Sequence, residues 1–230
     1  MRRTILFLAL AGFGSSAMAG SASATFTFAS DYLFDGVSQT QGDDDGDFHP
    51  AFQASFDYGF DNGFYAGIWG SNVDFGDDDP ADIEIDYYVG YAQEYESGWA
   101  WDVGALYYTY TGAPSDGYDY AEIMGALTFP TGTTAKLFLG DDDDLFGGSF
   151  NRFKLLHSFA LGETWSLDLE ATRTSYSSSD LEDFTHGQIG VSRDVGSFSF
   201  YVGYSDTDQD DNPNADGRVL FTLSTSVDLF

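Results

Sequence analysis

The sequence has no cysteine and few basic residues, and these two shortages exclude several classes of protein. Without cysteine there is no disulfide framework. Lys and Arg number 8 against 38 Asp and Glu, which gives a formal net charge of -30. Binding to nucleic acid depends on Lys and Arg neutralising phosphates. We therefore expect no nucleic acid among the partners of this chain.

Long apolar runs are also missing, because no apolar stretch after Gly20 approaches the ~18 residues that indicate a membrane-spanning helix. Chains as acidic as this one are often disordered. Disorder does not fit here, because 22 Phe, 15 Tyr and 4 Trp are too many aromatic residues for a solvated coil. The composition predicts a folded chain that is not a helical membrane protein.

The N-terminus has the three zones of an export signal. Residues 1–4 are basic, residues 5–14 are apolar, and Ala17-Met18-Ala19 fits the small-residue pattern cleaved before Gly20. The apolar run is too short to cross ~30 Å of hydrocarbon as a helix. We predict a signal peptide at 1–19 and one domain at 20–230. Cleavage would remove two arginines and change the formal charge from -30 to -32.

From Thr25 onward, apolar residues alternate with polar or small residues at a period of two. For example, Phe52 and Phe56 alternate with Gln53 and Asp57. Neighbouring side chains of a strand point to opposite faces, so each such segment has one apolar face. Twelve segments follow this pattern: 24–34, 50–60, 64–73, 83–95, 99–110, 118–129, 133–140, 150–161, 164–175, 184–194, 197–205 and 218–230.

The connections between these segments alternate in length. Those after even-numbered segments are short and contain Gly, Asn or Pro, as tight hairpin turns require. Those after odd-numbered segments are longer and acidic: 43–47, 77–80, 115–117, 141–144, 177–183 and 206–217. A soluble β protein has no reason to sort its loops in this way, whereas outer-membrane barrels combine short periplasmic turns with long outer loops.

The pattern therefore predicts an all-β fold, a transmembrane antiparallel up-and-down β-barrel of about 12 strands. Ten or eleven residues at ~3.3 Å each, tilted by ~45°, span roughly the 25 Å of the apolar band. The expected location is the outer membrane of a Gram-negative bacterium, with its lipid as a partner. The C-terminal Phe230 is the kind of residue that the barrel-assembly machinery is expected to recognise.

Three segments carry a resemblance to a known family. They read SDYLFDGVSQT at 30–40, FYAGIWGSNVDF at 64–75 and DVGALYY at 102–108. The first half of the chain resembles the TorF family of porin-like envelope proteins, and the second half does so by architecture. The resemblance implies an outer-membrane pore-like barrel and no catalytic or substrate-binding residue. Asp35 departs from the family pattern, which has a basic residue between Phe and Gly.

Alternation places ten charged side chains inside the predicted barrel, because charges are costly in hydrocarbon. We predict that they line a channel: Asp57, Glu84, Asp86, Asp102, Glu122, Lys136, Arg152, Lys154, Asp168 and Glu170. They could form a constriction in which an acidic wall faces a basic patch. Alternatively, Glu122–Lys136 and Lys154–Asp168 could pair along the wall and plug a narrow barrel. Small inward residues such as Gly90 favour at least a narrow lumen.

Neither catalysis nor a specific metal site is predicted. His186 and Ser192 would lie ~20 Å apart along one strand, beyond hydrogen-bond reach. The segment 206–217 starts with calcium-loop spacing but has Asp211 and Gly217 where Gly and Glu are required. We interpret the acidic loops as a solvated rim. No cofactor is expected.

We predict a passive channel for small solutes or ions that prefers cations. The alternative is a non-conducting barrel that has a structural role or displays its loops at the cell surface.

Overall fold

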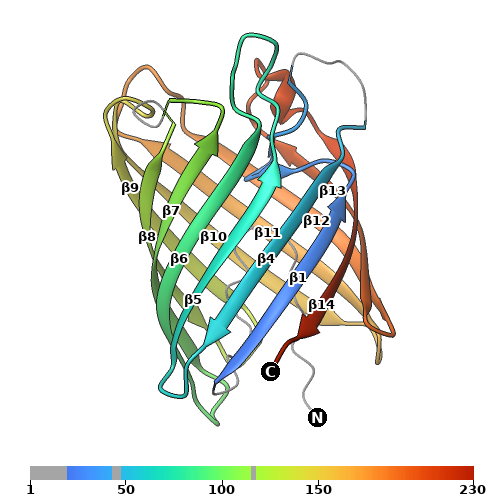
Figure 1. The fold of residues 1–230 in the computed structure, drawn as a ribbon. Helices are drawn as coiled ribbons and strands as arrows, with labels where there is room; N and C mark the ends of the chain where they lie inside the picture. Colours follow the sequence, from blue (N-terminus) through green and yellow to red (C-terminus); the bar gives the residue numbers. More distant parts are fainter. Residues whose placement is uncertain (1–19, 43–47, 115–117) are drawn as a thin grey trace.

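In the computed structural model, residues 20–42, 48–114 and 118–230 are described, and they form a closed antiparallel barrel of twelve strands (Figure 1). Each strand pairs with its neighbours along the chain, and β1 pairs with β14 to close the ring. The wall strands are β1(Ser21–Ala29), β4(Ala51–Gly59), β5(Phe64–Asn72), β6(Ile83–Glu94), β7(Ala100–Thr111), β8(Tyr120–Thr128), β9(Thr134–Asp142), β10(Gly148–Ala160), β11(Trp165–Tyr176), β12(Phe184–Val195), β13(Phe198–Thr207) and β14(Arg218–Asp228).

The predicted all-β barrel and its strand number are confirmed. The predicted signal peptide at 1–19 and the acidic stretches 43–47 and 115–117 lie outside the described residues. Among the described residues, the short 3-10 turn η2(Pro213–Ala215) is the helical element, and no helix is long and apolar enough to cross a membrane.

One strand boundary was predicted wrongly. The first segment was expected to run from 24 to 34, but β1 ends at Ala29 and the chain then leaves the wall. It forms a separate hairpin of β2(Leu33–Phe34) and β3(Val37–Ser38), which turns at Asp35 and Gly36. Both turn residues have a positive φ, 49° and 89°. Periodicity alone could not locate this change, because the residues become apolar again at Tyr32, Leu33 and Phe34 after the polar Ser30 and Asp31.

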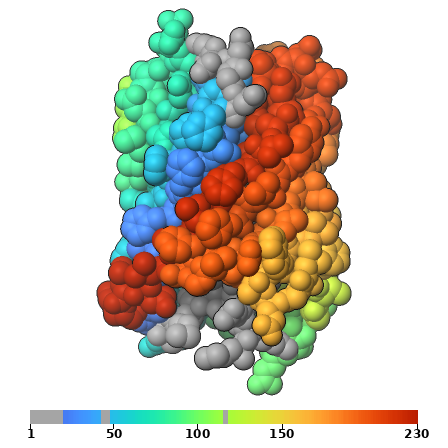
Figure 2. Space-filling view, turned by 90° about the vertical axis from the view of Figure 1, so that its right-hand side faces the viewer, coloured from blue at the N-terminus to red at the C-terminus, as the bar shows by residue number. Residues whose placement is uncertain are grey.

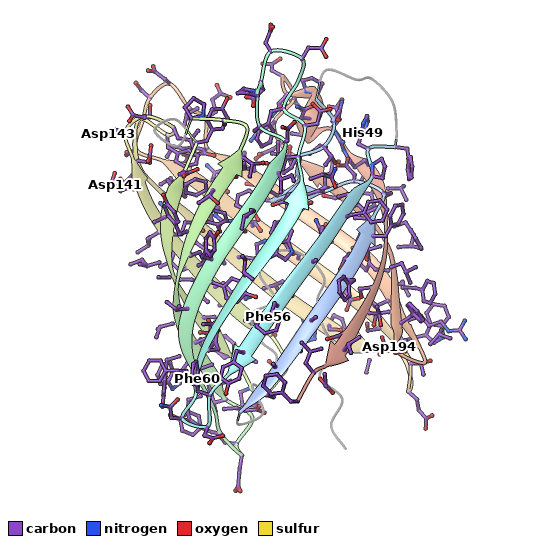
Figure 3. All side chains as sticks on the ribbon, viewed as in Figure 1. His49, Phe56, Phe60, Asp141, Asp143 and Asp194 are labelled. Carbon is purple, nitrogen blue, oxygen red and sulfur yellow. The ribbon has the colours of Figure 1, made fainter. Side chains whose placement is uncertain are left out.

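The outer face of the barrel is apolar. Side chains such as Phe52, Phe56 and Val89 are exposed on it, while their chain neighbours are buried or half-buried. Figure 3 labels Phe56 on this wall. The space-filling view shows the close-packed side chains of this face (Figure 2). A further set of exposed aromatic residues lies at or beside the short turns: Phe60, Phe64, Tyr95, Trp99, Trp165, Phe198 and Phe230. This arrangement matches the apolar band and aromatic girdle of a membrane barrel.

The two ends of the barrel differ. The short turns and the C-terminus lie at the lower end in Figure 1, and the longer connections lie at the upper end. Figure 3 places Asp141 and Asp143 at the upper rim, with Phe60 and Asp194 at the lower end. Side chains inside the barrel therefore lie either in an upper half near the long loops or in a lower half near the turns.

Candidate functional site: the barrel lumen

All ten predicted lumen residues lie on the inward-facing side of the wall. Asp57 is half-buried and the other nine are buried. Sequence alternation thus placed them on the correct face. Their role in lining a conduction path stays a prediction, because position alone does not test it.

A segment that the sequence did not place in the lumen crosses its upper half. The β2–β3 hairpin follows β1 and reaches the far wall at β10, five steps from β1 around a ring of twelve strands. Its tip also contacts β12 and β13, since a Cβ built on Gly36 would lie 2.6 Å from a ring carbon of His186 and 2.5 Å from the Thr207 methyl group. The hairpin is therefore an internal plug that spans the width of the barrel.

The tip residue Asp35 is the centre of a buried ion network. Its carboxylate lies 2.9 Å from Arg152 Nη1 and 2.7 Å from Lys154 Nζ. Arg152 also pairs with Glu122, and Lys154 Nζ lies 2.7 Å from Glu170 Oε1. Burial would raise the pKa of Asp35, but Lys154 and Arg152 oppose it and hold the pKa well below its ordinary value. Asp35 is therefore ionised at neutral pH.

This network corrects the predicted wall pairs Glu122–Lys136 and Lys154–Asp168. Glu122 is opposite Gly140, four residues from Lys136 on β9. Likewise, Lys154 is opposite Thr172, four residues from Asp168 on β11. Four residues correspond to ~13 Å along a strand, too far for an ion pair. The stagger between strands instead aligns Glu122 with Arg152 and Lys154 with Glu170.

The base of the hairpin is fixed by a second set of polar contacts. Asp31 lies 2.6 Å from Arg218 on β14, and it accepts hydrogen bonds from Ser38 and Thr40. Tyr32 donates a 2.8 Å hydrogen bond to Glu84 on β6. The plug is thus bound to three separate parts of the wall, at β6, β10 and β14.

The lower half of the lumen is filled in another way, by tyrosine rings that lie against inward glycines. A Cβ on Gly90 would lie 2.3 Å from the Tyr65 ring, and Tyr65 donates a 2.8 Å hydrogen bond to Asp102. Tyr88 covers Gly67 in the same manner and donates to Asp57. Small inward residues were expected to leave space for a lumen. At Gly90 and Gly67 the space is taken by aromatic rings, because a glycine lets a ring approach the backbone.

Lys136 and Asp168 complete the lower half. Lys136 lies directly opposite Lys154 in the β9–β10 register, and it forms no ion pair with any residue that the structure describes. Asp168 accepts hydrogen bonds from three serine hydroxyls, those of Ser158, Ser166 and Ser192. The two residues therefore have different roles: Asp168 is held by hydroxyls, while the ammonium group of Lys136 is available to the lumen.

His186 lies in the lumen, where it contacts Ser205 and Glu170 and not Ser192. Its Nε2 is 2.9 Å from Ser205 Oγ, and Ser192 bonds to Asp168 instead. Asp35, Glu170 and His186 offer possible ligand atoms within 4.8 Å of one another. The Lys154 ammonium already lies 2.7 Å from both carboxylates, so a cation is built into this cluster.

Comparison with known proteins identifies the family. Residues 14–227 match the Gcw_chp family, described as "Bacterial protein of unknown function". This chain is a member of the Gcw_chp family. The match does not test the resemblance to the TorF family. A search of the curated proteins found no match for the Gcw_chp protein.

Solved structures with a similar fold are barrels named as porins or channels. The KdgM porin has a TM-score of 0.55 and 8% identity, over 89% of this chain and 97% of that chain. The NanC porin has a TM-score of 0.56 and 10% identity, over 89% of this chain and 98% of that chain. The COG4313 outer membrane channel from Pseudomonas putida F1 has a TM-score of 0.55 and 8% identity, over 92% and 96%. These similarities confirm the barrel fold of the Gcw_chp protein.

Proposed function

We propose that this Gcw_chp protein is an outer-membrane channel for the passive diffusion of small solutes or ions, and that it prefers cations. The observation that carries the proposal is the closed twelve-stranded barrel with an apolar outer face and a charged interior. An apolar outer face is stable in contact with lipid, and charged side chains that point inward avoid the hydrocarbon of the membrane. Porin-like neighbours, the resemblance to the TorF family and the expected signal peptide support the same function, which involves no enzymatic step.

The expected partners of the protein follow from the proposed location in the outer membrane. They are outer-membrane lipid around the apolar outer face, small solutes or cations in the lumen, and the barrel-assembly machinery during biogenesis. In support, Phe230 is exposed at the lower end beside Tyr58, where a C-terminal signal would be accessible.

Cation preference rests on the balance of charge in the lumen. Asp35 and the seven inward carboxylates outnumber Lys136, Arg152 and Lys154, and the upper rim adds carboxylates such as Asp141 at the end of β9 and Asp143 in the loop after it. A low-dielectric wall lined by one sign of charge concentrates counter-ions. One similar porin is known in complex with oligogalacturonate, a polyanion. The acidic lumen of the Gcw_chp protein argues against a polyanionic solute here.

A non-conducting barrel is the second candidate, and the hairpin favours it. The β2–β3 plug crosses the upper half and is fixed at three parts of the wall. In this case the protein would have a structural role or display its acidic loops at the surface.

Single-channel recording separates the two candidates. The protein, refolded and inserted into a planar bilayer, should give discrete conductance steps, and a salt gradient should give a reversal potential of the sign for cation flow. Protein denatured before addition is the control for detergent artefacts. An anion-selective reversal potential would contradict the electrostatic argument. Absence of steps from protein with intact β-structure would favour the non-conducting barrel.

A further inference from the structure

The tip of the β2–β3 hairpin is held by side chains rather than by the sheet. The hairpin is a two-stranded unit separate from the barrel sheet, with two residue pairs, Leu33↔Ser38 and Phe34↔Val37. Two-stranded hairpins are at best marginally stable on their own. The tip therefore needs other interactions to stay across the lumen.

Those interactions converge on the charged residues of β10. Asp35 pairs with Arg152 and Lys154, and the Arg152 guanidinium also lies 4.4 Å from the centre of the Phe34 ring. The turn that presents Asp35 has a positive φ of 49°, a conformation that is unfavourable for a residue other than glycine.

The wall does not need Asp35 for its own charge balance. Without Asp35, Arg152 still pairs with Glu122 and Lys154 still pairs with Glu170. Asp35 is thus the one carboxylate of the network that belongs to the plug, and its two ion pairs join the tip to the far wall.

We propose that the β2–β3 hairpin is a gate within the barrel, held closed by the Asp35 latch on Arg152 and Lys154. This inference rests on the proposed channel function and adds its regulation. When the latch breaks, the tip leaves β10 while Asp31 and Tyr32 keep the base attached to β14 and β6. The upper half of the lumen then opens.

The first test is Asp35→Asn in single-channel recordings. It keeps the size of the side chain and removes the charge. We expect the ratio of closed to open time to fall by about tenfold or more, since a charge-assisted hydrogen bond is worth about that factor. The matched control is Asp183→Asn, which removes a loop carboxylate paired with Arg173 at 3.2 Å outside the lumen. This control should behave like the wild type.

The second test locks the gate. The chain has no cysteine, so Gly36→Cys with Thr207→Cys introduces the only possible disulfide. The predicted closeness of position 36 to the Thr207 side chain makes this pair suitable for a bridge. Oxidation should abolish the open state, and reduction of the same sample should restore it. The single Thr207→Cys variant should not respond to either treatment.

The outcomes separate the gate from the channel. The proposed gate is wrong if the wild type and Asp35→Asn have the same ratio of closed to open time. It is also wrong if the double-cysteine variant conducts equally when oxidised and when reduced. In both cases the proposed channel function is unaffected. Because Gly36 has a φ of 89° and a Cβ there would also lie 2.6 Å from a ring carbon of His186, a pair that folds without forming the bridge leaves the decision on the gate to the Asp35→Asn recordings. If no variant conducts, including one with residues 33–38 replaced by a short glycine linker, the proposed channel is wrong and the gate falls too.

Discussion

The upper and lower halves of this barrel share one wall and one sequence pattern, yet their interiors are filled by different means. In the upper half, a hairpin from a connecting loop brings Asp35 to Arg152 and Lys154, and the inner charges form ion pairs. In the lower half, rings such as Tyr65 lie on inward glycines, and Lys136 has no ion pair among the described residues. The paired charges hold the plug in place, whereas an unpaired charge such as that of Lys136 is the one that would act on ions under the proposed channel function.

The largest expected difference between the halves is in stability. Arg152→Met should destabilise the barrel by roughly 3–5 kcal/mol, because it leaves Glu122 buried without a cationic partner and removes one of the two cations paired with Asp35. Lys136→Met in the lower half breaks no ion pair within the described structure and should cost much less. Urea unfolding of both variants in the same detergent measures the difference. Equal losses would mean that the upper network does not dominate stability.

The next effect concerns ring packing in the lower half. Gly90→Ala should destabilise by about 1–3 kcal/mol, because its Cβ would lie 2.3 Å from the Tyr65 ring and force the ring to move. Gly125→Ala is the matched control, since a Cβ there has nothing within 4 Å. It should stay within about 0.5 kcal/mol of the wild type. A neutral Gly90→Ala would show that the lower half is loosely packed.

Acid should weaken the upper half through Asp35. The pKa of Asp35 is lower in the folded protein than in the unfolded chain. Ionised Asp35 therefore stabilises the fold above about pH 4, and this stabilisation is lost as the pH falls through the pKa of Asp35 in the folded protein. The stability difference between wild type and Asp35→Asn should therefore be constant near neutral pH and shrink in strong acid. Unfolding measured across this range tests the sign. A difference that grows in acid would contradict an ionised Asp35.

The smallest expected effect is on ion selectivity, and it belongs to the lower half. Lys136→Glu should strengthen cation preference, with a larger shift in reversal potential than the same change at any ion-paired site. Lys136→Arg, which keeps the charge, is the control. No shift with Lys136→Glu would mean that ions do not pass this residue.

Much of the architecture could be predicted from the sequence. Period-two alternation located the twelve wall strands to within a few residues at most boundaries, and it put residues such as Glu84, Asp102 and Lys154 on the inner face. These successes share a cause. One face of each strand contacts lipid and the other faces the lumen, so the alternation of apolar and polar side chains shows which residues point inward.

The departure of Asp35 from the TorF pattern was the signal that could have located the latch. This departure identifies Asp35 as an unusual residue of the first loop, but it does not predict that the loop lies inside the barrel. The polar pair Ser30-Asp31 interrupts the apolar alternation before Phe34, but a polar pair alone does not show that the chain turns into the lumen.

The sequence by itself determined the class of fold, the number of strands and the inward face of each. Only the tertiary structure decided which charges pair, that the small residues hold tyrosine rings, and that a loop crosses the interior. The physical reason is distance along the chain. Alternation depends on adjacent residues, whereas the Asp35–Arg152 pair joins residues 117 positions apart. Such a pair depends on the closure of the ring and the stagger between its strands, and neither leaves a local pattern in the sequence.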